Sequence, residues 1–151
     1  MGAARGANLA AGQRRMRCGS RPASVRGVEV LAVAARILIV DRSLDNREVL
    51  RTLLARRGAE TVEASTARRG LAAARETRPD LIVLDGDDSS EGASENARQL
   101  AAEAAGANTP IVVLGTLQRD ALPLGAATQV AKPYHYGQLL RKLESVLNRR
   151  S

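Results

Sequence analysis

Three short apolar runs, separated by segments with helical periodicity, restrict the folds open to this chain. The runs are RILIVD at 36–41, DLIVLD at 80–85 and PIVVLG at 110–115. Unbroken runs of Leu, Ile and Val of this length are typical of strands that are covered on both faces, as in a parallel sheet between helices. Two of the three runs end in an aspartate, Asp41 and Asp85. The sequence therefore predicts buried strands with acidic residues where two of them end.

Helical segments and shorter strands fill the intervals between these runs. The first interval has apolar residues at helical spacing, namely Val49, Leu50, Leu53 and Leu54. Ser43 can cap the start of this helix, and Gly58 can end it. Alternation predicts a strand at 60–64, and a fourth apolar stretch predicts a strand at 128–131. Further helices are predicted at 66–78, 93–105 and 138–148, whereas 116–127 is irregular.

The alternation of strands and helices predicts an α/β domain with a parallel sheet and helices on both faces. The crossover connections of such a sheet are right-handed. Ligands bind at the carboxyl ends of the strands, where the strand order reverses. Asp41, Asp85 and Lys132 each close a predicted strand, so we expect them to lie in one crevice.

Charge and composition divide the chain into two parts. The net charge is +7, but residues 1–35 hold six of the 23 Lys and Arg residues and one of the 16 acidic residues. We therefore predict a basic, disordered extension at 1–35 and a nearly balanced domain at 36–151. The balanced domain argues against direct nucleic-acid binding. No apolar run is long enough to span a membrane and no clean secretory signal is present, so we expect a cytoplasmic protein that binds no membrane.

Several kinds of catalytic site are excluded by what the sequence lacks. It has no glycine-rich phosphate or dinucleotide motif, and no nucleophile elbow accompanies its single histidine, His135. Its one cysteine, Cys18, cannot form an intrachain disulfide. Carboxylates and one lysine at strand ends remain. A carboxylate can attack phosphorus, an ammonium can neutralise phosphoryl oxygens, and Mg²⁺ prefers carboxylate and carbonyl oxygens.

The stretches RILIVDRSLDNREVLRTLLARRG, DLIVLD, TPIVVLGT and AKPY resemble the receiver domain of two-component response regulators. The resemblance covers about residues 36–148, with the motifs in the order of the family. It implies a flavodoxin-like, doubly wound, five-stranded parallel sheet in the order 2-1-3-4-5. Because the segment before Lys132 is short, the fourth helix is expected to be reduced.

The resemblance also implies roles for individual residues. Asp85 would be the phosphoacceptor, and Lys132, before a Pro133 that could be in the cis form, would contact the phosphoryl group. Asp41 and Asp87 would form the acidic pocket. Asp41, Asp85 and the backbone carbonyl of Asp87 would hold Mg²⁺.

Three positions depart from the family pattern. Arg42 stands where a second acidic metal ligand is usual, and Gly115 stands where a Ser or Thr is usual. Thr116, one residue later, would then supply the hydroxyl that contacts the phosphoryl group. Gln129 stands where an aromatic residue is frequent. Without that aromatic residue and a hydroxyl at 115, we expect phosphorylation to change the protein surface less.

The sequence leaves two arrangements open for Arg42 and the Mg²⁺ site. If Arg42 pairs with Asp85, it keeps that carboxylate ionised but blocks the metal. If the side chain of Asp87 or Asp88 points inward instead, the pocket regains negative charge and could hold Mg²⁺. Side-chain alternation cannot decide between these arrangements in a loop.

Two functions are therefore expected to compete. One is a receiver that takes a phosphoryl group from a histidine kinase or phosphotransfer protein and signals to a downstream protein partner. The other is a pseudo-receiver that binds proteins without Mg²⁺-dependent phosphorylation. In neither case is the chain expected to be an enzyme, because no further catalytic parts are present.

Overall fold

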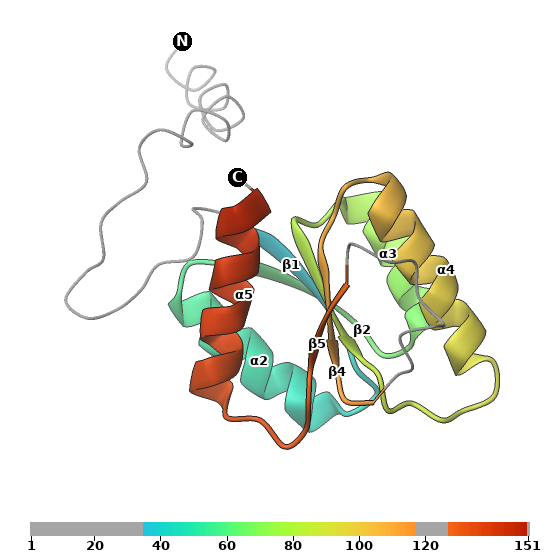
Figure 1. Ribbon diagram of the computed structural model, residues 1–151, viewed down its shortest axis with the longest axis horizontal. Helices are drawn as coiled ribbons and strands as arrows, with labels where there is room; N and C mark the ends of the chain where they lie inside the picture. The colour runs from blue at the N-terminus through green and yellow to red at the C-terminus, as the bar shows by residue number, and fades with distance from the viewer. Residues whose placement is uncertain (1–34, 117–126, 151) are drawn as a thin grey trace, which may run out of the picture.

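The computed structural model describes residues 35–116 and 127–150, which form a sheet between two layers of helices (Figure 1). All neighbouring strands are parallel, in the order β2-β1-β3-β4-β5. The strands are β1 Arg36–Val40, β2 Glu60–Ala64, β3 Leu81–Asp85, β4 Ile111–Leu114 and β5 Ala127–Val130. The described helices are α2 Leu44–Arg56, α3 Ala67–Thr77, α4 Ala93–Gly106 and α5 Tyr136–Arg150. The predicted fold and strand order are confirmed.

Local signals in the sequence account for most of these boundaries. The Ser43 hydroxyl accepts a hydrogen bond from the backbone N–H of Asn46, as expected for the cap of α2. Thr66 caps α3 in the same way. Strand β5 lies one residue earlier than predicted, and α5 begins two residues earlier, at Tyr136. The predictions for the N-terminal extension, Cys18 and the reduced fourth helix lie outside the described residues.

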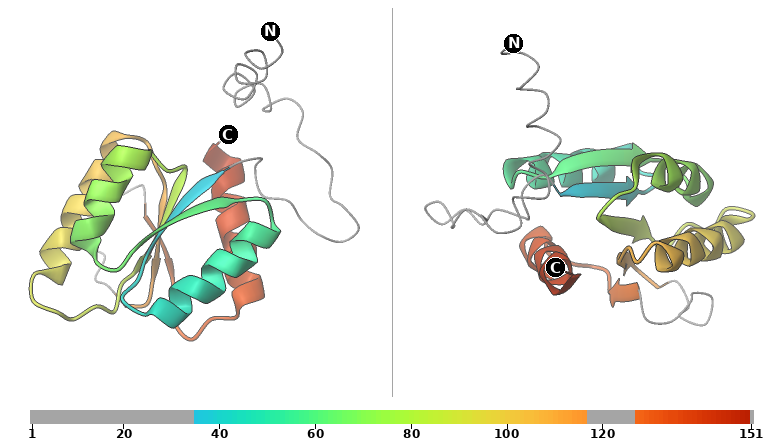
Figure 2. Two further views of the ribbon diagram at one scale, coloured as in Figure 1. Left: turned by 180° about the vertical axis from the view of Figure 1, so that it is seen from behind. Right: turned by 90° about the horizontal axis from the view of Figure 1, so that it is seen from above.

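The two faces of the sheet carry different cores. Figure 2 shows α2 and α5 on one face and α3 and α4 on the other. Alternate residues of each central strand point to opposite faces, so Ile37 and Ile39 pack toward α2 and α5, whereas Leu38 and Val40 pack toward α3 and α4. The first core is rich in leucine, and its α5 contribution is Leu139, Leu140, Leu143, Val146 and Leu147. These five residues are buried, as predicted.

On the opposite face, α3 and α4 approach the sheet mainly through small residues. Their buried residues are Ala67, Gly70, Ala74, Ala97, Leu100, Ala101 and Ala104. A Cβ atom added at Gly70 would lie 2.8 Å from Cγ2 of Val40. Helix α3 therefore lies against β1 with no space for a larger side chain at residue 70.

We expect Gly70→Leu to destabilise the protein by about 2–3 kcal/mol, because the new side chain must displace Val40 in a close-packed core. Urea denaturation followed by far-UV circular dichroism measures this. The control, Ala72→Leu, adds a larger side chain at an exposed position of the same helix. Equal stabilities of the two variants would show that α3 can move away from the sheet without cost.

Within the described residues, no helix combines the length and the apolar character needed to cross a bilayer.

Candidate functional site

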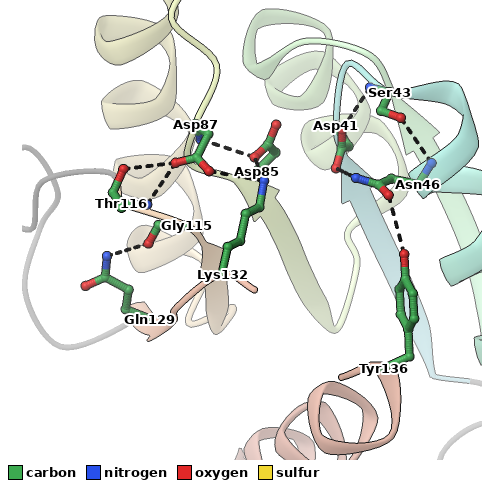
Figure 3. A network of polar contacts seen from close by, with 10 residues as sticks. All are labelled: Asp41, Ser43, Asn46, Asp85, Asp87, Gly115, Thr116, Gln129, Lys132 and Tyr136. Atoms are coloured by element: carbon green, nitrogen blue, oxygen red, sulfur yellow. Dashed lines mark hydrogen bonds and ion pairs between the residues drawn. The ribbon is translucent and has the colours of Figure 1, made fainter. Parts of the chain in front are cut away.

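Strand register brings the predicted site residues to one edge of the sheet. Val40 pairs with Leu84, so Asp41 and Asp85 follow at the same level on adjacent strands. Leu114 pairs with both Asp85 and Val130, which places Gly115 and Lys132 beside them. Figure 3 shows the side chains of Asp85, Asp87 and Lys132 close together, with Asp41 on the neighbouring strand end. The crevice expected at this edge therefore exists.

Lys132 joins two carboxylates in this crevice. Its Nζ lies 2.9 Å from Oδ1 of Asp85 and 3.2 Å from Oδ2 of Asp87 (Figure 3). Burial alone would lower the pKa of Lys132, but the hydrogen bonds and charges of Asp85 and Asp87 outweigh it and raise that pKa well above its ordinary value. Lys132 is thus a permanent cation beside Asp85. The Lys132–Pro133 peptide bond is cis, as predicted.

Asp41 is the most deeply buried acid of the site, with 4% of its surface exposed. Its Oδ1 accepts a hydrogen bond from the backbone N–H of Ser43 at 2.8 Å, and its Oδ2 accepts one from Nδ2 of Asn46 at 3.3 Å. The hydroxyl of Tyr136 donates in turn to Oδ1 of Asn46 at 3.4 Å. Burial raises the pKa of Asp41, the charge of Asp85 adds to this effect, and the hydrogen bonds from Ser43 and Asn46 oppose it.

Asp87 points away from Asp41 and toward the end of β4. Its Oδ1 accepts hydrogen bonds from the backbone N–H of Thr116 at 2.9 Å and from the Thr116 hydroxyl at 3.0 Å. The hydrogen bond from the Thr116 N–H is the main cause that lowers the pKa of Asp87, and Lys132 adds to it. Gly115 beside them has a φ of 103°, and its carbonyl accepts a hydrogen bond from Nε2 of Gln129 at 2.8 Å.

Arg42 lies on the other side of the crevice and pairs with Asp88, not with Asp85. Its Nη1 is 3.5 Å from Oδ1 of Asp88, and 59% of its side chain is exposed. Of the two arrangements that the sequence left open, the Arg42–Asp85 pair is not formed, because Lys132 contacts Asp85 while the Arg42 side chain extends toward Asp88 in the loop after β3. Arg42 still contributes a positive charge at the rim of the crevice.

A cavity of about 20 Å³ lies between the strand ends, and Asp41, Arg42, Asp85 and Asp88 are among the residues that line it. This volume is enough for one water-sized particle. Two carboxylates thus face a small cavity with cations on two sides. Such an arrangement can bind a small cation or stabilise a transferred anionic group on Asp85.

A model of the response regulator receiver domain family matches residues 37–144. This chain belongs to that family. It is a receiver domain of two-component phosphorelay signalling. Receiver domains are signalling modules that interact with histidine kinases or phosphotransfer proteins and with downstream partners, and they typically bind Mg²⁺ for phosphorylation.

Individual relatives agree with this assignment. The KDP operon transcriptional regulatory protein KdpE of Escherichia coli is 34% identical over 120 residues, which are 76% of this chain and 52% of KdpE. The phosphate regulon transcriptional regulatory protein PhoB of Pseudomonas aeruginosa is 30% identical over 78% of this chain and 53% of PhoB. The chain thus spans about half the length of these two relatives. It covers 98% of Protein PilH of P. aeruginosa, at 28% identity over 75% of its own length.

A solved structure of the chemotaxis protein CheY4 of Vibrio cholerae has the same fold. It superposes with a TM-score of 0.64 and 26% identity, covering 76% of this chain and 99% of CheY4.

The site of this receiver domain offers few oxygen donors to Mg²⁺. Within the described parts of the chain, no three His, Cys, Asp or Glu side chains are grouped to hold a metal ion. Mg²⁺, however, is often bound through one or two carboxylates together with water. The carboxylates of Asp41 and Asp85 and the carbonyl of Asp87 are oxygen donors of the kind that Mg²⁺ prefers, so these residues fit the ion. The number of protein donors is small, and the positive charge of Arg42 lies nearby.

Two residues of the receiver domain site were not predicted, namely Asn46 and Tyr136. Asn46 connects Asp41 to Tyr136, and so links the start of α2 to the start of α5 (Figure 3). The signal in the sequence was weak, since an Asn in the first turn of a helix usually serves only as a local capping residue. Their contact joins residues 90 positions apart, which no local pattern indicates.

Proposed function

We propose that this receiver domain accepts a phosphoryl group on Asp85 from a histidine kinase or phosphotransfer protein. The observation that carries the proposal is the 2.9 Å contact between Asp85 and Lys132 at the end of β3. In the transfer, an Asp85 oxygen forms a bond to phosphorus while the bond from phosphorus to the donor's imidazole nitrogen breaks, and the imidazole then takes up a proton. An acyl phosphate on Asp85 results.

Other residues of the chain would support this step. The Lys132 ammonium neutralises charge on the phosphoryl oxygens, and the Thr116 hydroxyl can donate a hydrogen bond to one of them. The hydrogen bonds from Ser43 and Asn46 hold the carboxylate of Asp41, which is the second carboxylate near the reacting one of Asp85. Asp41, Asp85 and the Asp87 carbonyl would hold Mg²⁺, which supplies positive charge to the transferred group.

The modified domain would signal through protein–protein contacts in the cytoplasm, without direct contact of the folded domain with nucleic acid or membrane. The excess of basic residues lies in positions 1–35, outside this domain. We place the boundary between the extension and the receiver domain near residue 36.

The pseudo-receiver is the competing function, and the Arg42–Asp88 ion pair favours it. A guanidinium at the rim of the crevice weakens the attraction for a divalent cation. In this case the domain would bind its partners without being modified on Asp85.

Incubation with Mg²⁺ and acetyl phosphate, followed by intact mass, tests the proposal. We expect the protein to gain the mass of one phosphoryl group and Asp85→Asn to gain none, because the amide cannot form the acyl phosphate. The control, Asp45→Asn, neutralises an exposed carboxylate in the first turn of α2 and should behave as the wild type. A gain retained in Asp85→Asn would refute Asp85 as the acceptor. A gain seen only with Arg42→Asp would establish the pseudo-receiver.

A further inference from the structure

Gly115 leaves a space that the Asp87 carboxylate fills. A Cβ atom built on Gly115 would lie 2.4 Å from Oδ1 of Asp87 and 2.6 Å from its Cγ. Such approaches are far shorter than van der Waals contact, so any side chain at 115 would have to displace the carboxylate. The position of Asp87 therefore depends on glycine at 115.

The donors around Asp87 are those that an oxyanion needs. They are the backbone N–H of Thr116, the Thr116 hydroxyl and the Lys132 ammonium, at 2.9, 3.0 and 3.2 Å. Two of them are the groups assigned above to a phosphoryl group on Asp85. Gln129 fixes the same backbone from its other side through the Gly115 carbonyl.

Asp87 also competes with Asp85 for the positive charge of Lys132. Lys132 contacts both carboxylates, so the ammonium is shared between two anions before any phosphoryl group arrives. A negative carboxylate at this place repels an incoming phosphoryl group as well. Both effects act against modification of Asp85.

We propose that Asp87 is a positioning residue, a carboxylate of the chain itself that holds Thr116 and Lys132 in the unmodified domain and competes with a phosphoryl group for them. The holding contact is a property of the unmodified protein, whereas the competition rests on the function proposed above. Gly115 is the residue that makes this internal contact sterically possible.

A double-mutant cycle on the unmodified protein tests the holding contact. Gly115→Ala is strained in any background, because the φ of 103° is unfavourable for alanine. In the wild-type background it must also expel Asp87, whereas in Asp87→Ala the space is free. Gly115→Ala raises the unfolding equilibrium constant in both backgrounds. We expect the factor by which it does so to be about tenfold smaller in Asp87→Ala than in the wild type. Equal increases in both backgrounds would overturn the proposal.

Amide hydrogen exchange gives a second readout without Mg²⁺ or a phosphoryl donor. We expect the Thr116 N–H to exchange about tenfold faster or more in Asp87→Ala, because it loses a hydrogen bond to a charged acceptor. Asp87→Glu keeps the negative charge but lengthens the side chain by one methylene group. We expect it to restore part of the protection of the Thr116 N–H against exchange. Unchanged exchange at Thr116 in Asp87→Ala would contradict the holding role.

The competition is measured as the initial rate of phosphorylation by acetyl phosphate at saturating Mg²⁺. We expect Asp87→Ala to react about three- to tenfold faster than the wild type, because Lys132 is released and a repulsive charge is removed. Glu91→Gln removes one exposed charge from the same loop and should leave the rate unchanged. A rate equal to or below the wild type would refute competition. Absence of reaction in both proteins, with the cycle and exchange results as expected, would refute the proposed function and the competition, but not the holding contact.

Discussion

Replacing Arg42 with aspartate is expected to increase the affinity of the domain for Mg²⁺ by about five- to thirtyfold. The substitution changes the charge at the rim of the crevice by two units. At about 7 Å in water this change contributes about 1–2 kcal/mol toward a divalent cation once 0.1 M salt is taken into account. It also releases Asp88 from its ion pair with Arg42.

Isothermal titration calorimetry with MgCl₂ measures this affinity directly. The matched control is Arg51→Asp, which breaks a comparable surface ion pair with Glu63 and lies about two turns into α2. The control changes the net charge equally, but its ion pair is with Glu63 on the edge strand β2 and not with a residue that lines the cavity. If both variants bind Mg²⁺ equally, the charge at position 42 does not govern the site.

Truncation of Leu143 to alanine is expected to reduce the free energy of unfolding by about 3–4 kcal/mol, a large fraction of the total for a domain of this size. Leu143 is fully buried in the core between the sheet, α2 and α5. The other buried residues of this core are aliphatic, and Tyr134 and Tyr136 pack against it while remaining partly exposed. Because such a core is close-packed, its side chains can fill the cavity only in part.

Urea denaturation monitored by far-UV circular dichroism measures the loss. Lys142→Ala serves as the control, because its side chain is exposed on the adjacent position of the same helix. A loss below about 1 kcal/mol in Leu143→Ala would mean that α5 does not form this core, since buried Leu to Ala changes cost more than that.

The strands and most helices could be predicted because their signals are local. Unbroken aliphatic runs distinguish β1, β3 and β4, and hydroxyl caps mark the starts of α2 and α3. Val49 shows the limit of periodicity. Its spacing groups it with the apolar residues of α2, but it is 39% exposed because it lies at the margin of the buried stripe formed by Leu50 and Leu54.

The members of the candidate site could be predicted, but their partners could not. Positions at strand ends follow from topology, so Asp41, Asp85 and Lys132 were placed correctly in one crevice. Which carboxylate meets which cation depends on loop conformation. Lys132 rather than Arg42 pairs with Asp85, and Asp87 turns toward Thr116 because Gly115 leaves space for it.

Both aromatic side chains of the chain lie beside the crevice. Tyr134 and Tyr136 meet edge to face, with ring centroids 5.6 Å apart, and Tyr136 reaches Asp41 through Asn46. With no tryptophan anywhere in the sequence, all ultraviolet emission of this protein must come from these two fluorophores. The molecule thus carries its own optical probe, and a label-free measurement would report events at one end of the sheet alone.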